Sequence, residues 1–172
     1  MPVIIDETKA CIARVYDAAL GGKGNYEVDR EVVRQVKRAA PEGEKLAWDC
    51  RNFLVRVTRF IAGHAGITQY LDCGARLPTA ENTHQVAQRL QPDAHVVYID
   101  NEPIVLAHGR ALLEENDQTH FGAADIFKQH EVLGNEVVRK YLAFSQPIAL
   151  FQLSTLHHYD GSRARKDHDR IH

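Results

Sequence analysis

Several residue types that mark particular classes of protein are scarce in this chain. Its 172 residues include one methionine, one tryptophan and three cysteines, which are Cys11, Cys50 and Cys73. An odd number of widely spaced thiols argues against a disulfide framework, and no two of them have the spacing of a metal-binding pair. We therefore expect reduced cysteines that pack as small apolar side chains.

Long apolar runs and an excess of one charge are also missing. No run approaches the roughly 20 apolar residues that span a bilayer, and the start, MPVIIDETKACIARV, lacks the pattern of a secretion signal. With 21 basic and 23 acidic residues, the net charge of −2 argues against a general nucleic-acid binder. These features predict a cytoplasmic protein with no membrane or nucleic-acid partner.

Helical periodicity dominates the first third of the chain. Residues 9–20, 25–39 and 44–64 each place apolar side chains at helical spacing. The stretch GGKGN ends the first helix, because glycine readily adopts the left-handed cap conformation, and Asn25 is placed to cap the second. The third has an apolar stripe of Leu46, Cys50, Phe53, Leu54, Val57, Phe60 and Ile61. We expect an N-terminal helical extension over residues 1–65.

The spacing of apolar residues changes after Gly66. Strand-like segments at 68–73, 94–100, 119–125 and 147–153 alternate with helical segments at 80–90, 102–116 and 130–143. This alternation indicates an α/β fold with a parallel sheet covered on both faces, and right-handed crossovers then give a Rossmann-like core. We expect that core at 66–158 and a solvated polar tail at 159–172.

The ends of the first three strands carry the candidate ligand-binding residues. In open parallel sheets, ligands bind beyond the carboxyl ends of the strands. Gly74 would let the backbone approach a ligand, Asp100 follows at about the spacing of an acid that holds ribose hydroxyls, and Asp125 ends the third strand within reach of an adenine amino group. The alternative is a scaffold whose acids cap helices, as Asp100 could do for the helix at Pro103.

The turn after the first strand departs from the dinucleotide fingerprint G-x-G-x-x-G. The corresponding positions are Gly74, Arg76 and Thr79, of which only the first is glycine. This argues against a nicotinamide cofactor and makes a nucleotide-dependent oxidoreductase the weakest hypothesis.

Four long motifs occur in a characteristic order: ARVYDAALGGKGNYEVDR at 13–30, QYLDCGARLPTAENTHQVAQ at 69–88, DAHVVYIDNEPIVLAHGRALL at 93–113 and PIALFQLSTLHH at 147–158. Together they resemble the bacterial S-adenosyl methyltransferase family, a class I family formerly catalogued as a domain of unknown function. The resemblance covers residues 10 to about 158. It implies a class I methyltransferase sheet of order 3-2-1-4, S-adenosylmethionine as cofactor, and methyl transfer to an unidentified acceptor. We expect a small-molecule acceptor, because nucleic-acid-binding features are absent.

The resemblance also implies roles for individual residues. The N-terminal signature would fold over the cofactor and its methionine end, where Lys23 could pair with the carboxylate. Asp72 and Gly74 would belong to the glycine loop after the first strand, and the next two strand ends would hold the ribose and adenine. The cofactor-binding residues so implied are Tyr16, Gly22, Lys23, Asn25, Asp72, Gly74, Arg76, Asp100, Asn101 and Asp125. A base helps when the acceptor is a hydroxyl or a protonated amine, and His157 and Tyr16 are the candidate catalytic residues, with His158 beside them.

Two departures from the family pattern leave a second hypothesis open. Arg76 stands where the family has its second loop glycine, and its side chain would either collide with the cofactor or pair with the methionine carboxylate. The four expected strands are fewer than the family fold has, and the residues after 158 resemble nothing in it, which suggests a truncation or frame change. The alternative is therefore a non-catalytic remnant that binds the cofactor weakly or serves as an interaction module.

The expected order leaves the fourth strand at an edge of the sheet. An apolar, uncharged edge strand such as IALFQL invites pairing with another chain. We expect a homodimer or the tail to cover it, or else aggregation. His168 and His172 are four residues apart in the tail, but nothing there supplies a buried second shell, so we expect no metal site.

Overall fold

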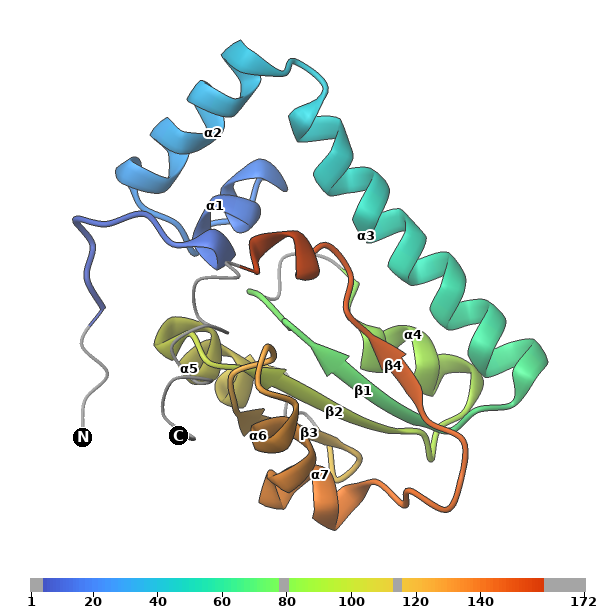
Figure 1. Ribbon diagram of the computed structural model, residues 1–172. Helices are drawn as coiled ribbons and strands as arrows, with labels where there is room; N and C mark the ends of the chain where they lie inside the picture. The colour runs from blue at the N-terminus through green and yellow to red at the C-terminus, as the bar shows by residue number, and fades with distance from the viewer. Residues whose placement is uncertain (1–4, 78–80, 113–115, 160–172) are drawn as a thin grey trace.

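The computed structural model describes residues 5–77, 81–112 and 116–159. Strands and helices alternate after an N-terminal group of three helices (Figure 1). In chain order the elements are α1 (Ile12–Ala19), α2 (Glu27–Ala39), α3 (Gly43–Phe60), the π-helical turn η1 (Ile61–Ala65), β1 (Gln69–Cys73), α4 (Thr83–Leu90), β2 (His95–Asp100), α5 (Pro103–Leu112), β3 (Thr119–Ala123), α6 (Gln129–Gly134), α7 (Glu136–Tyr141), β4 (Ala149–Phe151) and the 3₁₀ turn η2 (Leu156–His158).

The strands form a parallel sheet of order β3-β2-β1-β4, which confirms the predicted order. Tyr70 of the central strand β1 lies opposite Val96 of β2 and Ala149 of β4. Because all pairs are parallel, the carboxyl ends lie at one edge of the sheet, where α1 and η2 are also found (Figure 1).

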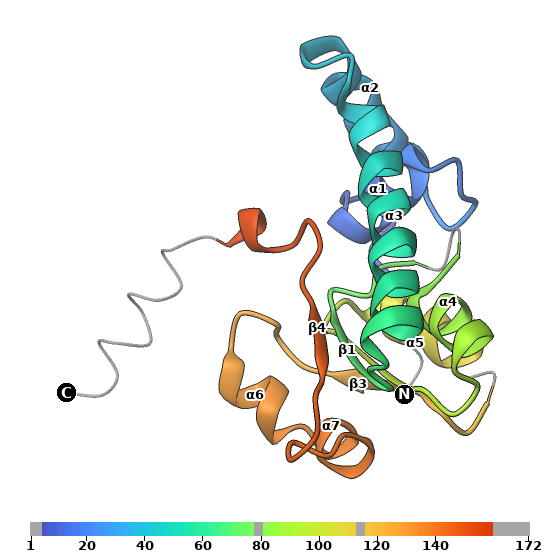
Figure 2. The ribbon, with the colours of Figure 1, turned by 90° about the vertical axis from the view of Figure 1, so that its right-hand side faces the viewer.

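The side chains of the strands alternate between two buried faces. Tyr70, Tyr98 and Phe121 belong to a cluster with α3, α4 and α5, whereas Leu71 and Val97 belong to a cluster with α6 and α7. Figure 2 shows these two groups of helices on opposite sides of the sheet. Burying a large apolar side chain contributes about 1.5–3 kcal/mol, so burial on both faces explains why these strands are apolar almost throughout.

A buried ion pair joins the first two helices. Arg14 Nε lies 2.9 Å from Asp29 Oδ2, and both side chains are almost fully buried. Asp29 also accepts hydrogen bonds from the backbone N–H groups of Cys11, at 3.1 Å, and Tyr26, at 2.9 Å. The prediction that Asn25 caps α2 is therefore wrong: Tyr26 is the N-cap residue, and Asp29 accepts its N–H group.

The buried face of α3 is offset from the predicted stripe. Ala47, Leu54 and Thr58 are buried, whereas Leu46 and Phe53 are exposed. Small side chains allow close approach to neighbouring elements, and the hydroxyl of Thr58 is satisfied within the helix by the carbonyl of Leu54 at 2.7 Å. Apolarity alone therefore selected the wrong residues for part of this face.

Two further elements differ from the predictions. The helix expected at 130–143 is divided into α6 and α7 at Asn135, whose side chain accepts a hydrogen bond from the N–H of Val137 at 3.0 Å and so starts a new helix. The fourth strand is shorter than expected, and Leu150 in its centre is 58% exposed. None of the helices that the structure describes has the length and apolar character needed to cross a membrane. The predicted tail lies almost entirely outside the described residues.

Candidate functional site

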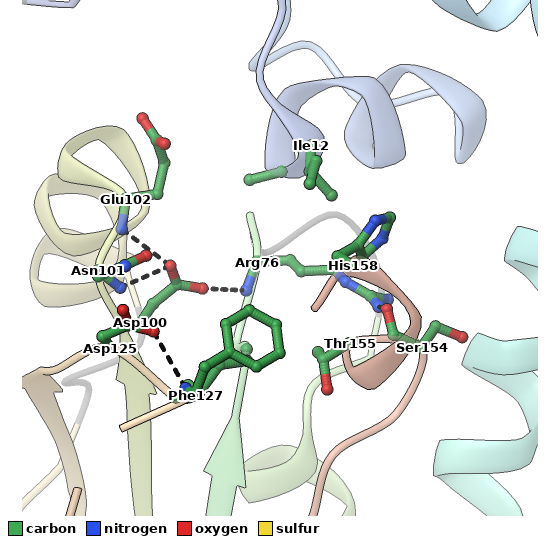
Figure 3. A pocket seen from close by; sticks show the side chains of 13 residues that line it. Ile12, Arg76, Asp100, Asn101, Glu102, Asp125, Phe127, Ser154, Thr155 and His158 are labelled. Atoms are coloured by element: carbon green, nitrogen blue, oxygen red, sulfur yellow. Dashed lines mark hydrogen bonds between the residues drawn. The ribbon is translucent and has the colours of Figure 1, made fainter. Parts of the chain in front are cut away.

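A cavity of about 440 Å³ lies at the carboxyl edge of the sheet (Figure 3). This volume is within the range of small-molecule sites, about 300–1,000 Å³. It is lined by α1, by the loops that follow β1, β2 and β3, and by the segment after β4. The lining residues are Ile12, Ala13, Gly74, Arg76, Asp100, Asn101, Glu102, Asp125, Ile126, Phe127, Ser154, Thr155 and His158. We call it the acidic cavity, because three carboxylates line it.

Asp100 ends β2 and is only 9% exposed. Its Oδ1 accepts hydrogen bonds from the N–H groups of Asn101, at 2.8 Å, and Glu102, at 2.9 Å, and so caps the start of α5. Its Oδ2 accepts the N–H of Arg76 at 3.3 Å (Figure 3). Burial raises the pKa of this carboxyl, against the effect of the three N–H groups. A carboxylate has about four acceptor positions, so Asp100 can cap the helix and still accept a bond from a ligand.

The other two carboxylates make the cavity favourable for a positively charged ligand. Burial and the neighbouring Asp100 raise the pKa of Glu102, so a cation bound beside them would relieve their mutual repulsion. Asp125 Oδ1 accepts the N–H of Phe127 at 3.0 Å, which fixes the turn after β3.

Phe127 is a lining residue that the sequence analysis did not select. Its ring extends away from Asp125, toward Thr155 in the view of Figure 3, and provides a flat apolar surface in the cavity, with Ile126 next to it in the chain. An aromatic ring two residues after a strand-end acid was the available signal. Such a ring is able to stack on a heteroaromatic base.

Gly74 is held by packing within the protein. Its φ of +89° lies in the left-handed region, and a Cβ at this position would collide with Thr155 Cγ2. Its N–H donates to the carbonyl of Ile99 at 2.8 Å. Glycine is therefore needed for the close approach of the β1 loop to the segment after β4, whatever ligand is bound.

The side chain of Arg76 runs along the wall of the cavity toward the segment after β4 (Figure 3). Its Nη2 donates to the carbonyls of Leu153, at 2.7 Å, and Ser154, at 2.6 Å. Its guanidinium carbon lies 3.8 Å from the centre of the Tyr16 ring, a cation–π contact. Arg76 itself has a φ of +60°, the conformation that a glycine would adopt without strain. The guanidinium therefore links the β1 loop, α1 and the segment after β4.

Asp72 belongs to the same loop region but does not line the acidic cavity. It shares a strand face with Tyr70, and it accepts a hydrogen bond from Thr83 Oγ1 of α4 at 2.6 Å. Burial raises its pKa, while Thr83 and the charge of Arg51 act in the opposite direction. Asp72 faces a gap of only about 20 Å³, which is too small for a cofactor.

The loop of the N-terminal signature is organised by Asp17, a buried residue that the sequence analysis did not single out. Asp17 Oδ2 accepts Gly24 N–H at 2.9 Å and Asn25 Nδ2 at 2.8 Å, and a Cβ on Gly22 would collide with the same carboxylate. Lys23 is exposed. The predicted residues Gly22, Lys23 and Asn25 thus lie together in this loop but do not line the acidic cavity.

The candidate catalytic residues lie at the boundary with a second, apolar cavity. Tyr16 donates its hydroxyl to the carbonyl of Ala47 at 3.0 Å, and burial raises its pKa. His157 lines the apolar cavity, and His158 lines both cavities. The two imidazole rings are 3.9 Å apart, and partial burial together with His157 lowers the pKa of His158. Within the described ranges, no three histidine, cysteine or acidic side chains are grouped to hold a metal ion, and His168 and His172 lie outside those ranges.

Three comparisons place this geometry among known proteins. Residues 2–170 match the S-adenosyl methyltransferase family. The match includes the polar end, so the expectation that the residues after 158 resemble nothing in the family is wrong. A crystal structure of a candidate methyltransferase from Thermobifida fusca YX superimposes with a TM-score of 0.86 at 44% identity, over 92% of this chain and 62% of that one. The crystal structure of a DUF574 family protein from Streptomyces avermitilis MA-4680 superimposes with a TM-score of 0.87 at 33% identity, over 98% of this chain and 65% of that one.

The chain thus spans less than two thirds of the length of these two solved relatives. No protein of curated function matches it. The comparisons do not favour the alternative of a non-catalytic module. A match over nearly the whole chain, together with the parallel sheet order of the fold, leads to one conclusion: the chain belongs to the S-adenosyl methyltransferase family.

Proposed function

We propose that the chain binds S-adenosylmethionine in the acidic cavity and transfers its methyl group to a small-molecule acceptor. The observation that carries the proposal is the Asp100 carboxylate, which lines a cavity with two further carboxylates at the carboxyl end of β2. The cofactor has a cationic sulfur and an ammonium group, and its ribose and adenine donate hydrogen bonds. A cavity lined by acceptors and negative charge complements these groups.

The lining residues divide into three regions that fit the parts of this cofactor. Asp100 and the adjacent Asn101 would hold the ribose, and Asp125 with Phe127 would hold the adenine. Arg76 and the backbone at Gly74 would hold the methionine part, where a guanidinium suits a carboxylate. Asp72 and the signature loop at Gly22, Lys23 and Asn25 would support these elements from outside the cavity.

The bound cofactor supplies an activated methyl group: the acceptor atom forms a bond to the methyl carbon, the carbon–sulfur bond breaks with its electron pair passing to sulfur, and the acceptor gives up a proton. The lowered pKa of His158 keeps its imidazole mainly neutral at pH 7, so His158 is suited to accept that proton. The raised pKa of Tyr16 keeps its phenol protonated, so Tyr16 would position groups rather than act as a base.

Calorimetric titration with S-adenosylmethionine and S-adenosylhomocysteine tests the cofactor site. Asp100→Asn retains an oxygen that caps α5 but loses the charge, and we expect about 10- to 100-fold weaker binding from the loss of charge-assisted hydrogen bonds. Asp93→Asn, an exposed acid outside the cavity, is the matched control and should bind as the wild type does. A folded wild-type protein that binds neither compound at millimolar concentration contradicts the proposal.

A further inference from the structure

The apolar cavity has a volume of about 450 Å³ and lies between α1, α2, α3 and the segment after β4. Its walls include Val15 and Ala19 of α1, Val32 and Val33 of α2, and Leu46 of α3. No acidic residue, lysine or arginine lines it among the described residues. The acidic cavity next to it, by contrast, is lined by three carboxylates and an arginine.

The two cavities are neighbours. Ile12, Ser154 and His158 line both of them, so side chains of α1 and of the segment after β4 form the shared boundary. The polar groups of the apolar cavity are concentrated on this side, where Cys50 Sγ lies 2.9 Å from Ser154 Oγ and the rings of His157 and His158 are 3.9 Å apart. A molecule in the apolar cavity would therefore have its polar end directed at the acidic cavity and its apolar body among the helices.

We infer that the apolar cavity is the acceptor site, and that its occupant is an uncharged aromatic or alkyl small molecule carrying one hydroxyl or amine. This inference rests on the proposed function, because it needs the cofactor in the acidic cavity. Among the residues lining the apolar cavity, no lysine, arginine or carboxylate would compensate a charge on the occupant, and burying an unpaired charge is costly. An apolar ring or chain gains free energy by covering the valines of α1 and α2. Phosphorylated, polyanionic or strongly cationic acceptors are thereby disfavoured.

The probes for this site are 2-naphthol, whose hydroxyl is un-ionised at pH 7, and 2-naphthoate, an anion with the same ring system. We expect 2-naphthol to bind at least about tenfold more tightly than 2-naphthoate, as measured by calorimetry in the presence of S-adenosylhomocysteine. Ala19→Phe fills the cavity and should abolish 2-naphthol binding, whereas Ala18→Phe, one residue earlier in α1 and outside the cavity, should retain it.

S-adenosylhomocysteine binding to the same samples separates the two proposals. Suppose that S-adenosylhomocysteine binds. The acceptor site is then refuted, while the cofactor site stands, if 2-naphthol does not bind, if it binds no more tightly than 2-naphthoate, or if its binding survives in Ala19→Phe. If S-adenosylhomocysteine does not bind to the folded wild type, the proposed function fails and the acceptor assignment fails with it. Interligand nuclear Overhauser effects between the naphthol ring and the S-methyl group of S-adenosylmethionine are expected, and their absence in a doubly bound sample refutes the adjacency of the two sites.

Discussion

Replacing Arg76 by glycine is expected to destabilise the ligand-free chain, although glycine is the residue type expected at this position from the family pattern. The substitution removes a left-handed backbone cost of about 1–2 kcal/mol. It also removes two charge-assisted hydrogen bonds to the carbonyls of Leu153 and Ser154, each worth about 1.5–3 kcal/mol, and a cation–π contact with Tyr16 of about 0.5–2 kcal/mol. Because Arg76 is partly exposed, the lower ends of these energy ranges apply to its contacts, and the net loss in the free energy of unfolding is about 2 kcal/mol.

Urea unfolding of three variants separates the backbone term from the contacts. Arg76→Ala loses the same contacts but keeps the unfavourable φ, so it should be about 1 kcal/mol less stable than Arg76→Gly. Arg110→Ala, on the exposed face of α5, is the control and should remain within about 0.5 kcal/mol of the wild type. If Arg76→Gly is as stable as the wild type, the bonds to the segment after β4 contribute nothing net and the reasoning is refuted.

The remaining predictions concern other parts of the fold. Burial and the neighbouring His95 lower the pKa of His120 from about 6.5, so the unfolded chain binds more protons and the free energy of unfolding should fall as the pH drops below about 6.5. His120→Phe should reduce this fall in urea titrations between about pH 7 and 5. An unchanged dependence of the free energy of unfolding on pH would contradict the prediction. Gly74→Ala should destabilise the chain by about 1–3 kcal/mol, and Thr155→Ser, which removes the colliding methyl, should recover part of that loss in a double-mutant cycle; strictly additive effects would argue against the contact. If β4 mediates self-association, Leu150→Lys should shift the sedimentation equilibrium toward monomer, whereas a wild type that is monomeric at all concentrations rules out this homodimer.

The parts of the fold that could be predicted are those governed by repeating patterns. Alternating strands and helices with right-handed crossovers indicated a parallel sheet, the resemblance to the family implied the order β3-β2-β1-β4, and the strand-end position of Asp100 indicated the acidic cavity. Patterns were less informative where single contacts decide the structure. Asn135 divides one apolar helical segment into two by capping the second, and a period of 3.6 residues does not reveal such a cap.

The site was harder to predict because motif membership does not specify where a side chain points. Asp72 and Asp100 lie on the same face of the sheet, but Asp72 is paired with Tyr98, two residues before Asp100 in register, and bonds to Thr83 of α4. Asn25 and Gly22 belong to the signature, but they are packed around Asp17, which the apolar spacing of α1 did not distinguish from a solvated residue. Such polar contacts depend on the path that the loop follows in space. The periodicity of the sequence does not reveal that path.

The two interpretations of the strand-end acids, helix caps in a scaffold or ligands of a cofactor, are not exclusive at Asp100. Its Oδ1 accepts the N–H groups of the two residues immediately before α5, while its Oδ2 accepts one N–H, at 3.3 Å, and Asp100 lines the cavity. The cap fixes the carboxylate in one orientation, so little side-chain entropy is lost when a ligand binds to it. The desolvation that raises its pKa means that a hydrogen-bond donor or a cation in the cavity would restore favourable interactions lost on folding. Burial in the fold therefore makes Asp100 better suited to bind a ligand. Asp100→Asn is the substitution that separates its role before α5 from its role in binding the cofactor.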